Sequence, residues 1–139
     1  MHRSRLAGFM IDCREGRLED AAAFWSSALD LPIVDPDEGG GGRYAVLGAG
    51  PGGLHVEVQM VEHPPRVHLD IEADDIDAEA ARLEALGARR IECVRGRWWV
   101  MEAPTGHRFC VVPLRDPERR ATPTTWHCPP PPPPPEPSA

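Results

Sequence analysis

Residues 42–47 read Gly-Arg-Tyr-Ala-Val-Leu, and residues 96–101 read Gly-Arg-Trp-Trp-Val-Met. In both copies an aromatic residue opens a short apolar run, and a Gly/Pro turn follows it. Apolar runs bounded by turn residues are typical of β-strands. A pattern that recurs 54 residues later predicts two similar modules that share one core, because a solenoid would need at least three units.

The elements around these two copies recur in the same order. In the first repeat, about 6–62, we expect a strand over 6–13, a helix over about 17–29 and strands over 43–47 and 54–61. In the second repeat, about 66–113, we expect a strand over 66–71, a helix over about 76–86 and strands over 90–94, 98–102 and 108–113. Residues 35–42 hold Pro36 and four consecutive glycines, which predicts a flexible loop.

The composition predicts one domain followed by a tail. A chain of 139 residues that is 41% hydrophobic has room for a single core, which we assign to residues 1–114. From residue 115 the composition changes, and residues 129–135 are seven prolines. We therefore expect a disordered proline-rich tail over 115–139. It lacks flanking basic residues, so a spacer is favoured over a ligand motif for a partner protein.

Charge and cysteine content narrow the classes of partner. The net charge of -7 disfavours nucleic acid and anionic membranes, so a small molecule or a protein is expected instead. The four cysteines form no CxxC pair and fit free thiols in a reducing compartment. No apolar run approaches the roughly 20 residues that a membrane span needs. We expect a cytoplasmic protein.

Strand alternation predicts which side chains share a face. In 66–71 we expect Val67, Leu69 and Ile71 to pack under the helices, which leaves His68, Asp70 and Glu72 facing inward. The same alternation turns Phe9 and Ile11 toward the helices. Across the other strands the residues expected to face inward are Met10, Asp12, His55, Glu57, Gln59, Arg108 and Cys110. Of these, His55 stands beside a glycine turn and is interpreted as a surface histidine. By the repeat Tyr44 pairs with Trp98, which we favour over Trp99 as the one tryptophan lining the cavity.

Several motifs together resemble the glyoxalase-like domain family of the vicinal oxygen chelate superfamily. They are Asp12-Cys13, Arg17-Leu18, Phe24-Trp25, the segment 66–71 (Arg-Val-His-Leu-Asp-Ile) with 74–77 (Asp-Asp-Ile-Asp), and 103–110 (Ala-Pro-Thr-Gly-His-Arg-Phe-Cys). The resemblance covers about residues 6 to 113. It implies an α+β fold in which two βαβββ modules form a half-open barrel around a central cavity. It also implies a homodimer.

The resemblance also implies where a metal would bind. Enzymes of this superfamily take one ligand from each of four strands, and here those places carry Gly8, Glu57, His68 and Cys110. Glu57, His68 and Cys110 would serve a divalent ion such as Zn, Ni, Mn or Fe, whereas glycine offers no side chain. We therefore favour a metal-free cavity. In that reading His68 pairs with Asp70 or Glu57, and Cys110 fills space.

Three functional hypotheses follow. The favoured one is a small-molecule-binding protein of the bleomycin-resistance-like type, whose acidic cavity suits an amine-bearing or aromatic ligand. The alternative is a metal-dependent lyase, isomerase or dioxygenase. The third is an interaction adaptor that works through the proline-rich tail. The sequence does not identify catalytic residues or the ligand.

Overall fold

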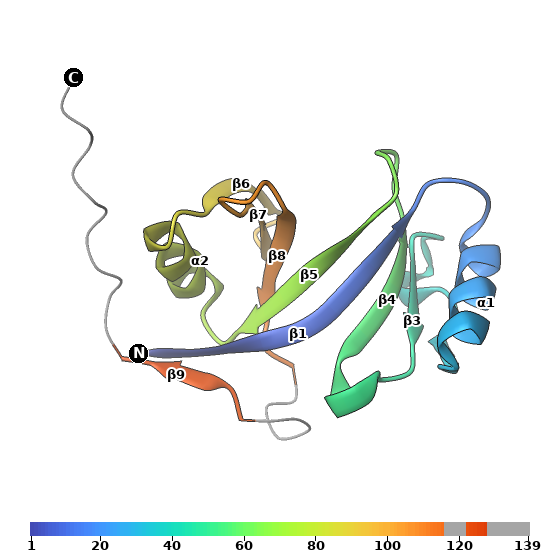
Figure 1. Ribbon diagram of the computed structural model, residues 1–139, viewed down its shortest axis with the longest axis horizontal. Helices are drawn as coiled ribbons and strands as arrows, with labels where there is room; N and C mark the ends of the chain where they lie inside the picture. The colour runs from blue at the N-terminus through green and yellow to red at the C-terminus, as the bar shows by residue number, and fades with distance from the viewer. Residues whose placement is uncertain (116–121, 128–139) are drawn as a thin grey trace. The chain divides into compact units, whose positions relative to one another are not determined.

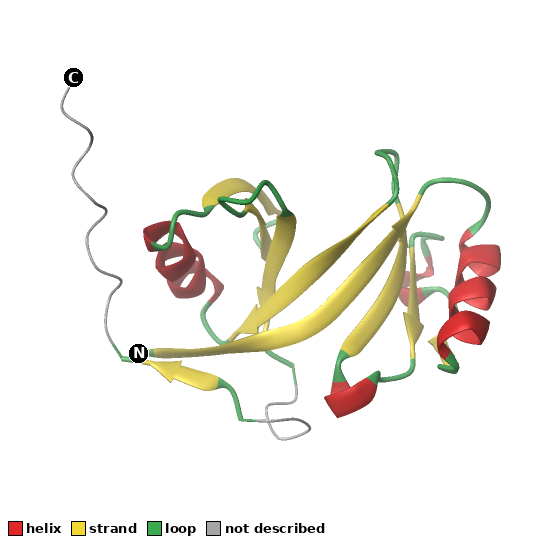
Figure 2. Cartoon of the chain, viewed as in Figure 1, coloured by secondary structure: helices red, strands yellow, loops and turns green. Residues whose placement is uncertain are grey.

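The computed structural model describes residues 1–115 and 122–127, which form an α+β fold (Figure 2). The chain divides into two compact units. We call Leu6–Asp70 the N-unit, and we call Met1–Arg5, Ile71–Arg115 and the described part of Pro123–Ala139 the C-unit. Each unit holds one helix and an open sheet, in the order β-α-β-β-β. This confirms the predicted α+β fold of paired βαβββ modules.

The N-unit contains one parallel and several antiparallel strand pairs. Its elements are β1 (His2–Cys13, of which Leu6 onward lies here), α1 (Leu18–Leu29), β2 (Ile33–Asp35), β3 (Tyr44–Leu47) and β4 (His55–Met60). The strand order is β2-β3-β4-β1, with β4 parallel to β1 and antiparallel to β3. Short 3-10 turns at Glu38–Gly40 and Pro51–Gly53 lie on either side of β3.

Helix α1 packs on one face of the N-unit sheet, against β3 and β4 (Figure 1). Leu18 and Ala22 are buried on one face of the helix, and they share a core with Ile11, Val56 and Val58. Acidic residues in the first turn suit the positive end of the helix dipole. The helix ends where the backbone turns left-handed after Leu29.

The C-unit has the same order of elements. It contains the end of β5 (Arg66–Ala73), then α2 (Ile76–Ala85), β6 (Arg89–Val94), β7 (Trp98–Glu102) and β8 (Arg108–Pro113). Strands β6, β7 and β8 pair antiparallel in a meander. Helix α2 lies against them and buries Ala80 and Leu83 beside Met101, Phe109 and Val111. Asp75 caps α2 by accepting a hydrogen bond from the Ala78 amide at 2.9 Å.

Part of the predicted tail is an ordered strand. Thr124–Trp126 forms β9, which pairs antiparallel with His2–Ser4 of β1 in the C-unit. The indole N–H of Trp126 donates to Ser4 Oγ at 2.9 Å, and the Arg82 guanidinium lies 3.8 Å from the centre of its ring. A three-residue strand has too little periodicity to be predicted. The seven prolines lie outside the described residues, so the spacer assignment stays a prediction.

Replacing the indole tests how firmly β9 is held. We expect Trp126→Ala to lower the free energy of unfolding by about 1 to 2 kcal/mol, because it removes one hydrogen bond and one cation–π contact. Urea unfolding followed by circular dichroism measures this change. Exposed Thr125 supplies the control, since Thr125→Ala leaves both contacts in place. Equal losses in the two variants would contradict a specific role for the indole.

Two further sequence expectations were wrong. Strand β2 was missed, because its three residues are short and largely exposed. Val67 and Leu69 were expected to pack under the helices, but both are more than half exposed, and only Ile71 of that set packs against a core. Alternation identified the shared face correctly, but the described helices leave that face open to solvent at Val67 and Leu69. Within the described residues, no helix is long and apolar enough to cross a membrane.

Candidate functional site

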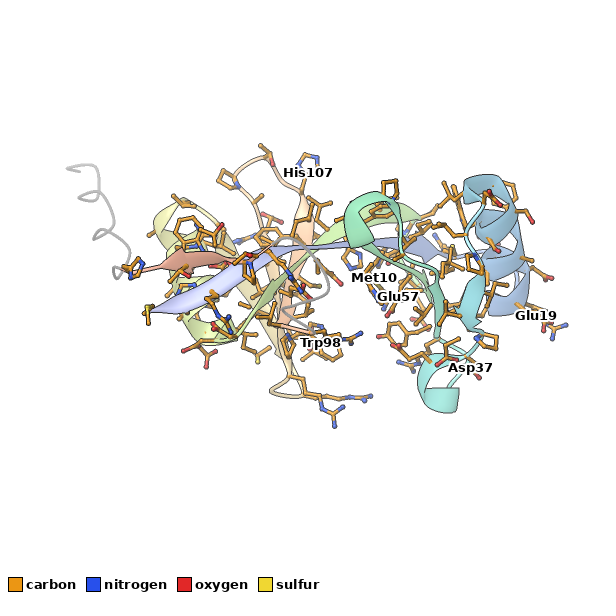
Figure 3. All side chains as sticks on the ribbon, turned by 90° about the horizontal axis from the view of Figure 1, so that it is seen from below. Met10, Glu19, Asp37, Glu57, Trp98 and His107 are labelled. Carbon is orange, nitrogen blue, oxygen red and sulfur yellow. The ribbon has the colours of Figure 1, made fainter. Side chains whose placement is uncertain are left out.

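Polar side chains gather on the face of the N-unit sheet that lies opposite α1. The β1–β4 register places Met10 beside Glu57 and Asp12 beside Gln59. Figure 3 shows Met10 and Glu57 on their neighbouring strands. The alternate residues Ile11 and Val56 belong to the core under α1. The predicted division of faces is therefore confirmed for these two strands.

Asp12 and His68 form the centre of this polar cluster. The Asp12 side chain is only 1% exposed, and its Oδ2 accepts a hydrogen bond from His68 Nδ1 at 2.8 Å. His63 Nε2 and Arg66 Nε each lie 3.8 Å from the same oxygen. The second oxygen, Oδ1, has no hydrogen-bond partner among the described residues, although it is buried. A buried acceptor without a donor costs free energy, so a donor group that reached Asp12 Oδ1 would bind favourably.

Asp70 adds a second carboxylate of the same kind. Its Oδ1 lies 3.5 Å from His68 Nε2, and within the described chain it too is buried without a hydrogen-bond partner. Burial raises the pKa of Asp70 to about 6, opposed by the charge of His68 and reinforced by that of Glu57. A carboxyl with this pKa exchanges its proton close to neutral pH, which is common at functional sites.

Glu57 and Gln59 extend the cluster along β4. Glu57 is buried, and its Oε1 lies 2.6 Å from His55 Nε2. Gln59 donates from Nε2 to the Tyr44 hydroxyl at 3.3 Å, which brings an aromatic ring to the end of the row. The N-unit thus assembles Met10, Asp12, Tyr44, Glu57, Gln59, His68 and Asp70 from four strands. These are seven of the eleven predicted cavity residues.

The other four predicted residues belong to the C-unit. Glu72 forms a buried ion pair with Arg5 at 2.5 Å, which gives it a structural role there. Trp99 packs on the C-unit core, so alternation turns Trp98 to the opposite face, as predicted. Arg108 Nε lies 3.3 Å from Glu102, and Cys110 is partly buried beside Val100 on β7. Their part in a ligand cavity stays a prediction.

The four-strand metal set does not fit this chain. A Cβ atom on Gly8 would lie 1.8 Å from the backbone oxygen of His55, so no ligand side chain can stand at that place. Glu57 and His68 belong to the N-unit, whereas Cys110 belongs to the C-unit, and a three-ligand set from these residues stays a prediction. Within the N-unit, His68 and Asp70 could both hold one ion, but catalytic zinc takes three protein ligands.

The Asp12–His68 hydrogen bond determines which imidazole nitrogen carries the proton. With Nδ1–H donating to Asp12, the neutral ring leaves Nε2 free as an acceptor facing Asp70. We expect Asp12→Ala to abolish this tautomer preference, seen as a change in the ¹⁵N chemical shifts of both ring nitrogens of His68. The ring of His107, in the C-unit, is the internal control and should not change. Unchanged shifts at His68 would contradict the role of Asp12.

Sequence reasoning missed two members of the cluster, His63 and Arg66. Alternation placed a third member, His55, on the inward face with Glu57 two residues later, but we interpreted it as a surface histidine beside a glycine turn. Its imidazole lies beside the buried Glu57 carboxylate. His63 and Arg66 lie in and after the turn between β4 and β5, and no pattern in the sequence predicts that they approach Asp12.

Comparisons with known proteins agree with this architecture. A family model described as "Glyoxalase-like domain" matches residues 8–112, whereas no curated protein matches the chain. Methylmalonyl-CoA epimerase from Mycobacterium tuberculosis is 17% identical, with a TM-score of 0.58 over 79% of this chain and 88% of its own. Homoprotocatechuate 2,3-dioxygenase from B. fuscum (H200Q variant) is 15% identical, with a TM-score of 0.53 over 81% of this chain and 33% of its own. At these identities the likeness shows the fold alone.

Proposed function

Because this chain belongs to the glyoxalase-like domain family of the vicinal oxygen chelate superfamily, we propose that it is a small-molecule-binding protein of the bleomycin-resistance-like type. The ligand is held by the polar cluster of the N-unit without a metal. It carries a protonated amine or amidine, whose N–H groups donate to Asp12 and Asp70. Members of one fold differ in chemistry, so this proposal rests on the residues of the cluster and not on the fold.

The two buried carboxylate oxygens without donors carry the proposal. Asp12 Oδ1 and Asp70 Oδ1 are the buried side-chain oxygen or nitrogen atoms of the described chain that lack a hydrogen-bond partner. Leaving each unpaired costs about 1 to 3 kcal/mol, and a donor from a ligand would recover that free energy. Hydrogen bonds that a cation donates to a carboxylate are stronger than those that a neutral group donates.

The charge and shape of the surroundings favour the same class of ligand. Asp12, Glu57 and Asp70 are three carboxylates on one face, and a cation there is attracted by all of them. Tyr44 supplies an aromatic ring at the end of the row, which can stack on a planar group or contact a cation. The basic groups around these carboxylates already face Asp12 Oδ2 and Glu57, whereas Oδ1 of Asp12 and of Asp70 can only accept hydrogen bonds when ionised, so carboxylates and phosphates are disfavoured there.

Thermal-shift screening followed by calorimetry tests the proposal with named probes. Benzylamine, benzamidine and agmatine are the cationic probes, with benzyl alcohol and benzoate as matched neutral and anionic controls. We expect stabilisation by the cations alone, and loss of binding in Asp70→Asn. The control variant is Glu92→Gln, which removes an exposed carboxylate on β6. Stabilisation by benzoate as strong as by benzylamine would overturn the proposal.

The metal-dependent alternative makes an opposite prediction. It requires stoichiometric metal in protein purified without an affinity tag or chelator, or after incubation with zinc, nickel, manganese or ferrous iron. Elemental analysis measures this directly. Tight metal that is lost in His68→Ala would replace our proposal with the lyase, isomerase or dioxygenase hypothesis.

A further inference from the structure

Among the described residues, His68 separates the two buried carboxylate oxygens that lack a hydrogen-bond partner, which belong to Asp12 and Asp70. Arg66, His68 and Asp70 are alternate residues of β5, so their side chains leave one face of the strand at intervals of roughly 6.5 Å. Asp12 Oδ2 lies 2.8 Å from His68 Nδ1 and 3.8 Å from Arg66 Nε. Asp12 therefore lies beside the interval between Arg66 and His68, whereas Asp70 lies beyond His68.

The imidazole ring of His68 turns a different nitrogen toward each carboxylate. Its Nδ1 donates to Asp12 Oδ2 at 2.8 Å, and its Nε2 lies 3.5 Å from Asp70 Oδ1. The His68 side chain is only 12% exposed, so neighbouring groups hold the ring in this place. An ammonium group donates a hydrogen bond over about 3 Å. A single ammonium therefore reaches one of the two free oxygens at a time, whereas two separate donor groups can reach both.

The charges of the cluster also match two positive charges better than one. Asp12, Glu57 and Asp70 are acidic, and Arg66 is the arginine that lies against them. The other basic groups of the cluster are histidines, which the formal charge of the chain counts as neutral. Three negative charges and one positive charge leave an excess of two negative charges. A ligand with two cationic groups neutralises this excess, and each group is attracted by every carboxylate of the cluster.

The side chains that lie against Asp12 leave room for a ligand to enter. Arg66 and His63 are 47% and 37% exposed, and each has a nitrogen 3.8 Å from Asp12 Oδ2. This distance is longer than a hydrogen bond, so both contacts are loose. An incoming ammonium can displace these two side chains by rotation, without a change in the sheet. It would then donate to Asp12 Oδ1, which has no other donor among the described residues.

We propose that the ligand is a short diamine or a guanidino amine that places one cationic group on Asp12 and the other on Asp70, so that its chain spans His68. This inference rests on the proposed function and narrows it from amine-bearing molecules in general to those with two cationic groups. Met10 precedes Asp12 by two residues on the same face of β1. Its apolar side chain is therefore available to the methylene groups that connect the two cations.

Calorimetric titration of the full chain with three matched probes tests the proposal. The probes are 1,4-diaminobutane, butylamine, which has the same carbon chain and one ammonium, and 4-amino-1-butanol, whose hydroxyl keeps a second donor without its charge. We expect the diamine to bind at least about tenfold more tightly than either of the other probes, which is equivalent to about 1.4 kcal/mol. This comparison needs no variant, so it does not depend on whether a substituted chain folds.

Asp12→Asn then removes one of the two charged ends of the site. The asparagine oxygen can still accept the hydrogen bond from His68, so the ring keeps its place while the charge is lost. We expect this variant to bind 1,4-diaminobutane no more tightly than butylamine, with butylamine binding at Asp70 unchanged. Glu92→Gln, which alters an exposed carboxylate on β6, is the matched control and should keep the tenfold preference. Unfolding curves check that both variants are folded.

Each remaining outcome counts against a specific claim. Equal binding of 1,4-diaminobutane and butylamine by the parent chain would overturn this inference and leave the proposed function standing. A tenfold preference that persists in Asp12→Asn would overturn it too, because the second ammonium would then bind elsewhere. If none of the three amines binds, the proposed function fails, and this inference fails with it.

Discussion

Asp70→Asn is expected to stabilise the protein at pH 7 by about 1 to 2 kcal/mol while it abolishes ligand binding. Burial raises the pKa of Asp70 from 3.8 to about 6, so the folded state disfavours its charge. The full pKa difference corresponds to about 3 kcal/mol at most, and the lost attraction between Asp70 and His68 reduces the gain. The asparagine amide can donate to His68 Nε2, which lies next to this position.

The pH dependence gives this prediction a sign that can be checked. Below pH 3.8 Asp70 is mostly protonated in both the folded and the unfolded chain, so it does not lower the free energy of unfolding. Between about pH 4 and 6 the unfolded chain loses its proton while the folded state keeps it, so the free energy of unfolding falls as pH rises. Above about pH 6 Asp70 is ionised in both the folded and the unfolded chain, so its effect on the free energy of unfolding no longer changes with pH. The difference between Asp70→Asn and the parent protein should therefore grow from pH 4 to 6 and then level off.

Asp74 is the matched control, because its pKa moves in the opposite direction. Burial alone would raise the pKa of Asp74, but hydrogen bonds from the Arg3 amide and guanidinium outweigh it and lower the pKa. Asp74→Asn should therefore destabilise the protein at pH 7, and the loss should shrink toward acid pH. Urea unfolding at several pH values measures both variants. Destabilisation by Asp70→Asn at pH 7 would show that Asp70 is a structural ion-pair partner and not a strained binding group.

Gly8→Ala is expected to cost about 3 kcal/mol of stability, a large effect for one methyl group. The added Cβ would lie 1.8 Å from His55 O and 2.6 Å from His55 N, both backbone atoms of the strand paired with β1. Backbone cannot rotate aside as a flexible side chain does. Strands β1 and β4 must therefore separate locally, which disturbs the register that holds Met10 beside Glu57.

Gly41→Ala isolates the clash from the general effect of adding a methyl group. A Cβ at Gly41 has no atom within 4 Å, and its φ of -99° suits any residue. We expect a change within about 0.5 kcal/mol for this variant. If Gly8→Ala were as mild, the close approach of β1 and β4 would be wrong, and a histidine at this place could restore the fourth metal ligand of the superfamily.

The local pattern of apolar and polar residues was sufficient to predict most of the fold. The repeat of residues 42–47 in 96–101 predicted paired modules, and both long helices begin within a residue of their predicted starts. Alternation along β1 and β4 correctly separated Ile11 and Val56 from Met10 and Glu57. These features follow from the spacing of neighbouring residues, which the backbone geometry of a helix or strand translates directly into faces.

Contacts between distant residues were decided only by the tertiary structure. The sequence placed His68 and Asp12 on inward faces, but 56 residues separate them, and their 2.8 Å hydrogen bond exists because the folded N-unit brings their strands together. The burial that raises the pKa of Asp70 arises in the same way. Strand alternation also did not predict that Val67 and Leu69 are exposed. A period of two determines which side chains share a face, whereas what covers that face depends on how elements far apart in the chain pack.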